Sequence, residues 1–408
     1  MKANQLLEEA KSYENTLVET RRYLHQHAET GFDLKETKSY VKEELTKMGY
    51  EPADCGKAGL VVTAGGKKEG KVFLIRGDMD ALPIKEETGA EYACETGNMH
   101  ACGHDMHTTM MLGAARLLKA HEDEIEGTVK LMFQPAEEIF EGSKDMIDAG
   151  VLENPSVDAA MMIHVMAGMP FLAGTVVVCD GGVSAPGADF FTIKIQGKGC
   201  HGSMPNTGID PIPVAAHIIN ALQELQTREL GLGDDNVLTI GSIHGGKAPN
   251  IIADTVELTG SIRTFDETVR QFIKDRMTEI SKGMAATFRA TAEVSFYSGC
   301  PVLDNDGDLS ACVASYTKEL LGAGKAFTKA ELAAMSGGQK QQKGGGSEDF
   351  AYISQKVPSL MLALAAGQPE NGHVYPQHHP KVTFDETVLA PGSAVYAYNA
   401  MRWLEEHK

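Results

Sequence analysis

Four short apolar runs, each ending in polar or glycine-rich residues, constrain the fold of this chain more than any other feature. They are "GLVVTAG" (59–65), "KVFLIRGDMDALPI" (71–84), "TVKLMFQPAEE" (128–138) and "DAAMMIHV" (158–165). A strongly helical segment, "HTTMMLGAARLLKAHEDEI", separates the second run from the third. Strands that alternate with helices are typical of a mostly parallel α/β sheet. We therefore predict such a sheet, preceded by two helices within residues 4–50.

The sequence pattern changes near residue 185. From there to residue 298 the chain shows alternating segments such as "DFFTIKIQGKG" and "TVELTGSIRTF", together with two amphipathic helices. This alternation favours antiparallel strands, and therefore a small α+β domain. We predict an α/β fold in which residues 1–184 and 299–408 form one domain and residues 185–298 form a smaller inserted domain. A glycine- and glutamine-rich stretch at 336–350 is expected to be a mobile loop.

The composition of the chain excludes several classes of function. A formal net charge of −19 and a pI near 5.2 argue against nucleic acid as a partner. No apolar run is long enough for a membrane span, and the N-terminus lacks the apolar core of a signal peptide. Seven cysteines, an odd number, do not suggest a disulfide framework. We therefore expect a cytoplasmic protein with no membrane partner.

Polar side chains follow the apolar runs at the points where the predicted strands end. These residues are Asp78, Asp80, Glu137, Glu138 and His164. In open parallel sheets, ligands bind at the carboxyl ends of the strands. Their shared position therefore predicts a functional site at that edge of the sheet.

The stretch "NMHACGHDMHTT", which begins at Asn98, places Cys102 and His104 two residues apart. Residues at this spacing do not share a helix face, but they converge if they lie in a turn ahead of a helix that begins near His107. Either residue alone is more often structural than functional. Together with His164 and the glutamates, they suit zinc, with manganese, cobalt or nickel as further possibilities.

Two other motifs are ambiguous when taken alone. The adjacent carboxylates Glu137 and Glu138 are most simply a solvated acidic pair, but neighbouring side chains diverge at a strand end. One of them can then bind a metal while the other faces a water molecule. Near the C-terminus, "YPQHHPKVTFDE" offers His378 and His379 as further ligands.

Taken together, the motifs resemble a known family. They are "RGDMDALPI", "HACGHDMHTTMMLGAA", "QPAEE", "HGSMPNTGIDPI", "APNIIAD", "GSIRTFD", "GSEDFAY" and "HHPK…FDE". This set is similar to the metal-dependent aminoacylase and carboxypeptidase family. It is most similar to the amidohydrolase branch, which includes hippurate hydrolases, auxin-conjugate hydrolases and N-acyl-L-amino acid amidohydrolases. The resemblance extends from "RRYLHQHAETGF" at residue 21 to the C-terminal helix. It implies a metallohydrolase domain with an inserted dimerisation or lid domain.

The resemblance implies a site for two divalent ions, with zinc or manganese favoured over cobalt or nickel. Cys102, at a position where other branches use an aspartate, would bridge both ions as a thiolate. His104 and His164 would complete the ligands of one ion, and Glu138 and His378 those of the other.

The family pattern also implies roles around the ions. His378 is chosen over His379 because the pattern is histidine, any residue, proline, and Pro380 follows at that spacing. Glu137 would be the general base, and Asp80 would orient a ligand histidine. His100, His107 and Asp78 are expected to be structural.

The inserted domain is expected to contribute to the substrate site. His201 resembles the family histidine that donates a hydrogen bond to the reacting carbonyl, usually from the partner subunit. Asn250 and Arg263 are candidates for holding the substrate carboxylate, although Arg263 is equally suited to a structural ion pair. Cys200 stands where the family usually has glycine.

The predicted function is hydrolysis of the amide bond of an N-acyl amino acid, which releases a carboxylic acid and a free amino acid. A dipeptidase or carboxypeptidase on the same site is the alternative. A hydrolase that uses Cys102 as nucleophile would leave the glutamates, His164 and His378 without roles. A non-catalytic metal-binding protein is a further alternative. By analogy, we expect a homodimer, or a dimer of dimers, formed through the inserted domain.

Overall fold

The computed structural model describes residues 2–335 and 344–408, which divide into two compact units. The first unit holds the chain up to Ser184 and most of the chain after Asp304. The second unit runs from Ala185 to Leu303, five residues past the expected end of the insert at 298, and includes a short segment that ends at Ala351. Most of the glycine- and glutamine-rich stretch that we expected to be mobile, at 336–343, lies outside the described residues.

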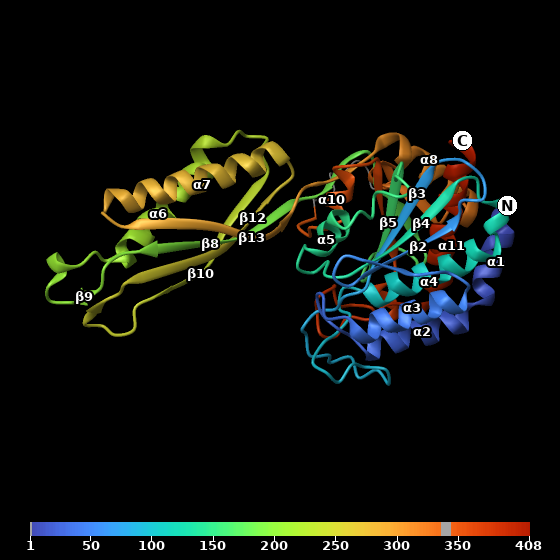
Figure 1. Ribbon diagram of the computed structural model, residues 1–408, viewed down its shortest axis with the longest axis horizontal. Coiled ribbons are helices and arrows are strands. Elements are labelled where there is room, and N and C mark those ends of the chain that lie inside the picture. Colours follow the sequence, from blue (N-terminus) through green and yellow to red (C-terminus); the bar gives the residue numbers. More distant parts are fainter. Residues whose placement is uncertain (1, 336–343) are drawn as a thin grey trace. The chain divides into compact units, whose positions relative to one another are not determined.

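The first unit is built on an eight-stranded sheet with the order β1-β2-β4-β3-β5-β16-β6-β15 (Figure 1). Its strands are β1 Ala53–Cys55, β2 Gly59–Gly65, β3 Val72–Asp78, β4 Thr128–Gln134, β5 Ala159–Met166, β6 Val176–Val178, β15 Ala326–Thr328 and β16 Ser359–Ala365. The four central strands, β4, β3, β5 and β16, are mutually parallel, as are β6 and β15. β2 is antiparallel to β4, and β6 to β16. The mostly parallel sheet predicted from the apolar runs is thus confirmed.

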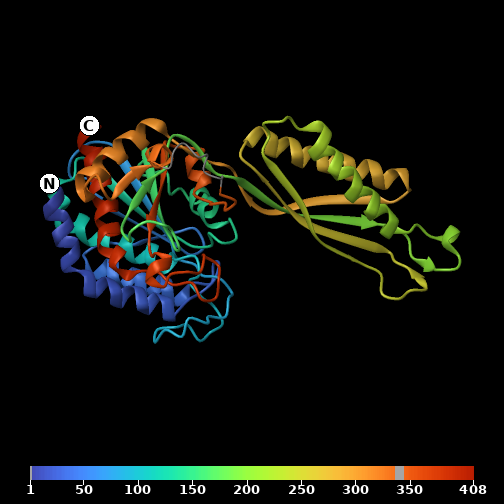
Figure 2. The same cartoon turned by 180° about the vertical axis from the view of Figure 1, so that it is seen from behind.

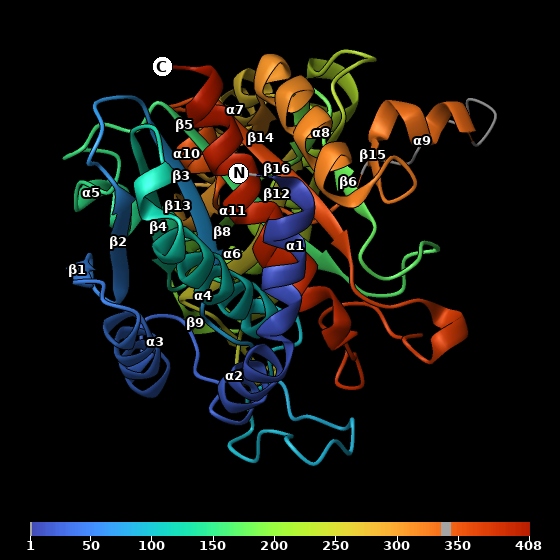
Figure 3. The same ribbon diagram turned by 90° about the vertical axis from the view of Figure 1, so that its right-hand side faces the viewer.

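Helices cover the sheet of the first unit. They are α1 Ala3–Ser12, α2 Glu14–Gln26, α3 Lys35–Lys47, α4 His104–Ala120, α5 Gly142–Asp148, α8 Gly307–Leu321, α9 Lys329–Met335, α10 Ala351–Ser354 and α11 Leu389–Glu406. α4 and α11 pack side by side against β3, and α1 packs on α11 (Figure 3). Within the described residues, no helix is long and apolar enough to cross a membrane.

The expectation of two helices within residues 4–50 was wrong, since the structure has three there. The backbone of Tyr13 (φ −95°, ψ 1°) leaves the helical conformation, so α1 ends at Ser12 and α2 begins at Glu14. The apolar positions continue at helical spacing across this break, and the pattern therefore does not reveal it.

The second unit has a four-stranded antiparallel sheet with the order β10-β12-β8-β13. Its strands are β8 Gly187–Gln196, β10 Asn236–Gly245, β12 Thr255–Thr264 and β13 Thr291–Cys300. α6 (Pro211–Glu224) and α7 (Glu267–Thr287) pack together on one face of this sheet (Figure 2). A separate two-stranded ribbon pairs β9 (Cys200–His201) with β11 (Ile251–Ile252). Two further short strands, β7 (Gly182–Ala185) and β14 (Leu303–Asn305), also pair, and most of their residues belong to the first unit.

A buried ion-pair network joins α2 to the start of α4. Arg21 Nε donates to Asp105 Oδ2 at 2.8 Å, and His25 Nδ1 lies 2.7 Å from the same oxygen. Burial alone opposes ionisation of Asp105, but the Arg21 guanidinium and the His25 hydrogen bond hold its pKa well below the usual range. The network therefore depends on an ionised Asp105.

Asp105→Asn is expected to lower the free energy of unfolding by about 3–5 kcal/mol, because it removes the nearest and most buried carboxylate from the buried Arg21 charge and leaves it with the more distant Glu386 at 3.2 Å. Urea unfolding near neutral pH measures this loss. The depressed pKa of Asp105 stabilises the folded state at pH values above the pKa of an unfolded aspartate, about 3.9. The difference in the free energy of unfolding between wild type and Asp105→Asn should therefore become smaller as the pH falls below about 4. Asp54→Asn, which removes an exposed partner of Lys38, is the control and should cost less than about 1 kcal/mol. Equal losses in the two variants would contradict the prediction.

Candidate metal centre

The five expected ligands lie in the first unit and converge on one place. They are Cys102 in the turn before α4, His104 as the first residue of α4, Glu138 after β4, His164 in β5 and His378 near the C-terminus. The ligand atoms of Cys102, His104 and His164 all lie within 4.8 Å of one another. The same holds for Cys102, Glu138 and His378. Cys102 is therefore shared by two groups of three potential ligands.

Gly103 sets the geometry of the turn that carries Cys102. Its φ is +95°, and an added Cβ would lie 2.4 Å from Val165 Cγ2, so only glycine fits here. This left-handed residue precedes the first turn of α4, and the helix therefore begins at His104. Our expectation that it begins near His107 was wrong by about one turn.

Asp80 holds the backbone on which both glutamates are placed. Its Oδ1 accepts the Glu137 N–H at 3.0 Å, and its Oδ2 accepts the Glu138 N–H at 3.2 Å. Its backbone carbonyl accepts from His104 Nδ1 at 2.8 Å, which directs His104 Nε2 towards the two glutamates, 3.8 Å and 3.9 Å away. Ala136, just before the pair, has a φ of +56°, a strained value of the kind that clusters at functional sites. Asp80 thus positions the glutamates and a histidine together.

Asp80→Asn is expected to fold and to lose about 10–100-fold in metal affinity or activity. The asparagine oxygen can accept one of the two backbone N–H groups, while its NH₂ group is forced against the other. Metal titration and steady-state kinetics measure the effect. Asp158→Asn is the matched control, because the Asp158 carboxylate also accepts a backbone N–H, that of Val72 at 2.9 Å. If both variants behaved alike, Asp80 would have no positioning role.

The histidines His164 and His378 each present a ring nitrogen to the centre. His164 Nδ1 donates to the Val165 carbonyl at 2.7 Å, so its Nε2, 3.6 Å from Cys102 Sγ, carries the lone pair. Burial lowers the pKa of His164 to about 3, which keeps the imidazole neutral. His378 is held by a backbone hydrogen bond to the Ala101 carbonyl at 2.9 Å, and its Nε2 lies 3.6 Å from Glu138 Oε1.

The centre has the properties expected of a cation site. Among the described residues, His104 Nε2 and Glu138 Oε1 are buried and have no hydrogen-bond partner. Burial raises the pKa of Glu138 to about 7 and also raises the pKa of the Cys102 thiol. A divalent cation would provide both the missing partners and the positive charge that stabilises the anionic forms. The sulfur, nitrogen and oxygen donors therefore fit such an ion.

Two of the neighbouring residues expected to be structural, His107 and Asp78, have partners that suit that role. His107 donates from Nδ1 to Asp78 Oδ1 at 2.6 Å, and its Nε2 accepts the Val165 N–H at 2.8 Å. Asp78 also pairs with the buried Arg76 at 2.7 Å. His100 is buried, and burial lowers its pKa to about 3.

The two histidines near the C-terminus differ in their surroundings. The ring of His379 stacks on Tyr375 at a centroid distance of 4.3 Å, whereas His378 joins the cluster. Gln377 was not among the residues predicted from the sequence. Its Nε2 donates at 2.9 Å to the Val165 carbonyl, which also accepts from His164 Nδ1. Its position next to "HHP" was the only signal in the sequence.

His201, Asn250 and Arg263 belong to the second unit, and the metal centre belongs to the first. His201 ends β9 and is exposed, and Asn250 immediately precedes β11. Arg263 donates from Nη1 to Ser347 Oγ at 2.6 Å and to the Gly345 carbonyl at 3.0 Å. These bonds hold the arginine against the glycine-rich segment.

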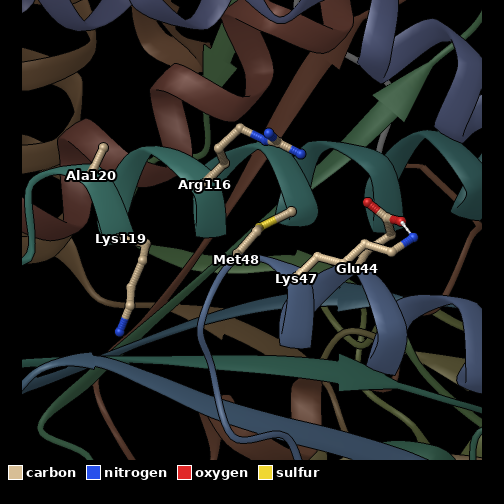
Figure 4. Close-up of a pocket in the computed structure, with 6 residues that line it drawn as sticks. All are labelled: Glu44, Lys47, Met48, Arg116, Lys119 and Ala120. Carbon is tan, nitrogen blue, oxygen red and sulfur yellow. Dashed lines mark hydrogen bonds and ion pairs between the residues drawn. The ribbon is translucent and has the colours of Figure 1, made fainter.

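A pocket of about 410 Å³ lies at the opposite end of α4 from His104 (Figure 4). It is lined by Glu44, Lys47, Met48, Arg116, Lys119 and Ala120. Lys47 pairs with Glu44 at 2.8 Å, and Lys119 pairs with Glu122 at 3.2 Å. Two of the cations in this pocket are thus paired with glutamates, and its lining contains no cysteine or histidine ligand.

The fold and the ligand cluster define a class of protein, and comparison with known families names it. Residues 74–402 match the model of peptidase family M20/M25/M40, so the chain belongs to this family. The protein is thus a hydrolase, and the family expected from the sequence motifs is confirmed.

Several relatives share most of their length with this chain. An N-acetyl-L-cysteine deacetylase of Bacillus subtilis is 36% identical over 97% of this chain and 90% of its own length. Thermostable carboxypeptidase 2 of Saccharolobus solfataricus is 34% identical over 98% of both chains. An IAA-amino acid hydrolase of Arabidopsis thaliana is 35% identical over 98% of this chain and 88% of its own.

Two solved structures are also similar in sequence and fold. A putative aminohydrolase from methicillin resistant Staphylococcus aureus matches with a TM-score of 0.87 and 35% identity, over 98% of this chain and 100% of its own. A Bacillus subtilis protein described as a dinuclear metal binding peptidase of the M20 family matches with a TM-score of 0.77 and 32% identity. That match covers 97% of this chain and 99% of the other.

Proposed function

We propose that this protein hydrolyses the amide bond of an N-acyl amino acid and releases a carboxylic acid and a free amino acid. The observation that carries this proposal is the pair of ligand groups that share Cys102, with Glu137 within 4.8 Å of His104 and Glu138. The names of two relatives, N-acetyl-L-cysteine deacetylase and IAA-amino acid hydrolase, support this substrate class.

The ligand set supports two divalent ions per chain. His104 and His164 would hold one ion, Glu138 and His378 the other, and the Cys102 thiolate both. The description of a similar structure as a dinuclear metal binding peptidase agrees with this arrangement. The mixed sulfur, nitrogen and oxygen donors favour zinc or manganese, with cobalt or nickel as substitutes. When bound, such ions polarise the amide carbonyl and lower the pKa of the attacking water.

Glu137 is the proton carrier in this proposal. Its carboxylate takes a proton from the attacking water and delivers it to the departing amine nitrogen, so that a free amino group leaves. Asp80 fixes the Glu137 backbone through the 3.0 Å hydrogen bond. His201 would donate a hydrogen bond to the carbonyl oxygen, and Asn250 and Arg263 would hold the carboxylate of the amino acid.

An exopeptidase is the second candidate function. It is favoured by the 34% identity to a thermostable carboxypeptidase, and the same side chains would carry out the reaction. The surroundings of Cys102 argue against a hydrolase that uses this cysteine as its nucleophile. Burial and the neighbouring Glu138 raise the pKa of this thiol, whereas a thiol nucleophile needs a lowered pKa.

A substrate panel tests the proposed function directly. The protein is stripped with a chelator and reloaded with zinc, manganese, cobalt or nickel. It is then assayed for amine release from N-acetyl, N-benzoyl and longer acyl amino acids beside dipeptides. We expect hydrolysis of acyl amino acids that requires an added ion. Hydrolysis that persists without metal would overturn the metal mechanism, and turnover of dipeptides alone would select the exopeptidase.

We also propose a homodimer formed through the second unit. β10 lies at the edge of its sheet and carries the exposed side chains of Val237 and Ile243. An edge strand with exposed apolar residues is a template for pairing with another chain. Light scattering should give twice the 43.8 kDa mass of one chain, and a monomer mass would contradict the dimer.

A cytoplasmic location remains part of the proposal, on the argument from cysteine number.

A further inference from the structure

The turn that carries His201 is fixed by its own backbone hydrogen bonds. Gly202 N–H donates to the Asn250 carbonyl at 2.8 Å, and Met204 N–H donates to the His201 carbonyl at 2.8 Å. A Cβ added at Gly202 would lie 2.8 Å from the Asn250 carbonyl oxygen, so the two segments approach closely because this residue is glycine. The backbone of the turn is therefore well defined.

Cys200 helps to close the same turn. Its Sγ donates to the Met204 carbonyl at 3.5 Å, and Thr207 Oγ1 donates to the same carbonyl at 2.8 Å. The thiol also fills the space beside Gly208, where an added Cβ would lie 2.5 Å from the sulfur. Cys200, which stands where the family usually has glycine, thus packs inside the turn.

Ser203 makes two contacts with one ring nitrogen of His201. Its hydroxyl oxygen lies 2.8 Å from His201 Nδ1, and its backbone N–H donates to the same nitrogen at 3.2 Å. A backbone N–H can only donate, so Nδ1 must accept and therefore carries the lone pair. In a neutral imidazole the single proton then lies on Nε2.

The same contacts fix the orientation of the ring. The χ2 torsion of histidine is broad and roughly two-fold, so an unrestrained ring exchanges the positions of its two edges. With Nδ1 held by Ser203, Nε2 lies on the opposite edge of the ring. The exposed His201 ring thus presents an N–H donor in its neutral form, and the doubly protonated imidazolium is not required.

We propose that Ser203 is a positioning residue that holds His201 as the outward-facing Nε2–H tautomer. This rests on the proposed role of His201 as the donor to the substrate carbonyl oxygen. A donor aimed at the developing negative charge stabilises the transition state, whereas a nitrogen lone pair in that place would repel it. Ser203 therefore acts on the reaction through His201 and not through contact with the substrate.

Nitrogen NMR of the zinc-loaded protein, labelled at histidine, tests the tautomer without any activity measurement. The His201 signals are assigned by their absence in His201→Ala. We expect a proton on Nε2 and none on Nδ1 in the wild type. Ser203→Ala loses the 2.8 Å hydroxyl contact and keeps only the 3.2 Å backbone N–H contact, so we expect its Nδ1 signal to shift and the share of the Nδ1–H tautomer to increase. A wild-type Nδ1 that carries the proton, or identical signals in the two proteins, would overturn the proposal.

Kinetics provide a second readout that a purely structural role would not produce. Ser203→Ala should lower kcat on the order of tenfold, less than the roughly 10²–10³-fold expected for removal of an oxyanion donor in His201→Ala. Ser203→Thr should restore most of the rate. Ser203→Ala should have no further effect in the His201→Ala background, because its action passes through the ring. Additive losses would overturn the proposal.

Thr207→Ala is the matched control, since it removes a hydroxyl hydrogen bond from the same turn without touching His201. It should leave kcat and the His201 signals unchanged, and a loss equal to that of Ser203→Ala would assign the effect to the turn instead. If His201→Ala retains full activity, the proposed role of His201 fails. The NMR result then still decides whether Ser203 fixes the tautomer.

Discussion

Cys102→Ala is expected to remove both ions from the centre and to reduce hydrolysis to background. Cys102 belongs to both groups of potential ligands, so loss of its sulfur leaves each group with two side chains. Structural and catalytic sites for such ions normally use three or four protein ligands. Elemental analysis of the purified variant measures the metal content, and amine release measures the activity.

Two further variants make the Cys102 prediction specific. Cys102→Asp should retain ions and part of the activity, because a carboxylate, like a thiolate, can bridge two cations. Cys94→Ala removes a buried cysteine outside the ligand groups and should change neither quantity. A Cys102→Ala protein that keeps both ions and full activity would refute the shared-ligand arrangement.

Glu137→Gln is expected to lower kcat by about 10²–10⁴-fold while metal content stays unchanged. Glutamine keeps the size of the side chain and the Glu137 N–H bond to Asp80, but it cannot accept the proton of the attacking water. Glu138→Gln should show the opposite pattern, with weakened metal binding as its main effect, because Glu138 is the residue grouped with Cys102 and His378.

Measuring both glutamate variants in parallel separates the two roles. Each is assayed for metal content and for kcat under saturating zinc. Restoration of activity by excess metal is expected for Glu138→Gln and not for Glu137→Gln. The reverse pattern would exchange the assignments, and metal loss in both variants would mean that neither residue is a dedicated proton carrier.

The sequence predicted most of the fold because its signals are local. Each of the four apolar runs became a strand, and the alternating segments after residue 185 became the antiparallel sheet of the second unit. Helix boundaries were less predictable. Tyr13 interrupts a helical pattern that is continuous in apolar residues, and the left-handed Gly103 starts α4 about one turn early. Both features depend on backbone conformation, which residue type constrains only weakly.

In the candidate site, too, the sequence predicted some features and not others. Residue types in short motifs indicated Cys102, His104, Glu138, His164 and His378, and the structure brings these five together. The contacts that position them join residues far apart in the chain. Asp80 lies 57 residues from Glu137, and Gln377 lies 212 residues from Val165. No spacing rule detects such pairs, and the Ser203 contact with His201, although local, has no signature that separates it from an ordinary turn.

The Asp80 carboxylate accepts hydrogen bonds from two successive backbone N–H groups, and this affects how the substrate preference of such an enzyme can change. In the proposed mechanism, the main chain rather than side-chain packing sets the distance between the proton carrier Glu137 and the ligand Glu138. Residues around a substrate can therefore be exchanged without disturbing that spacing. Substrate selectivity can then change while the catalytic residues keep their positions, and a preference for a new substrate requires no change in the metal centre.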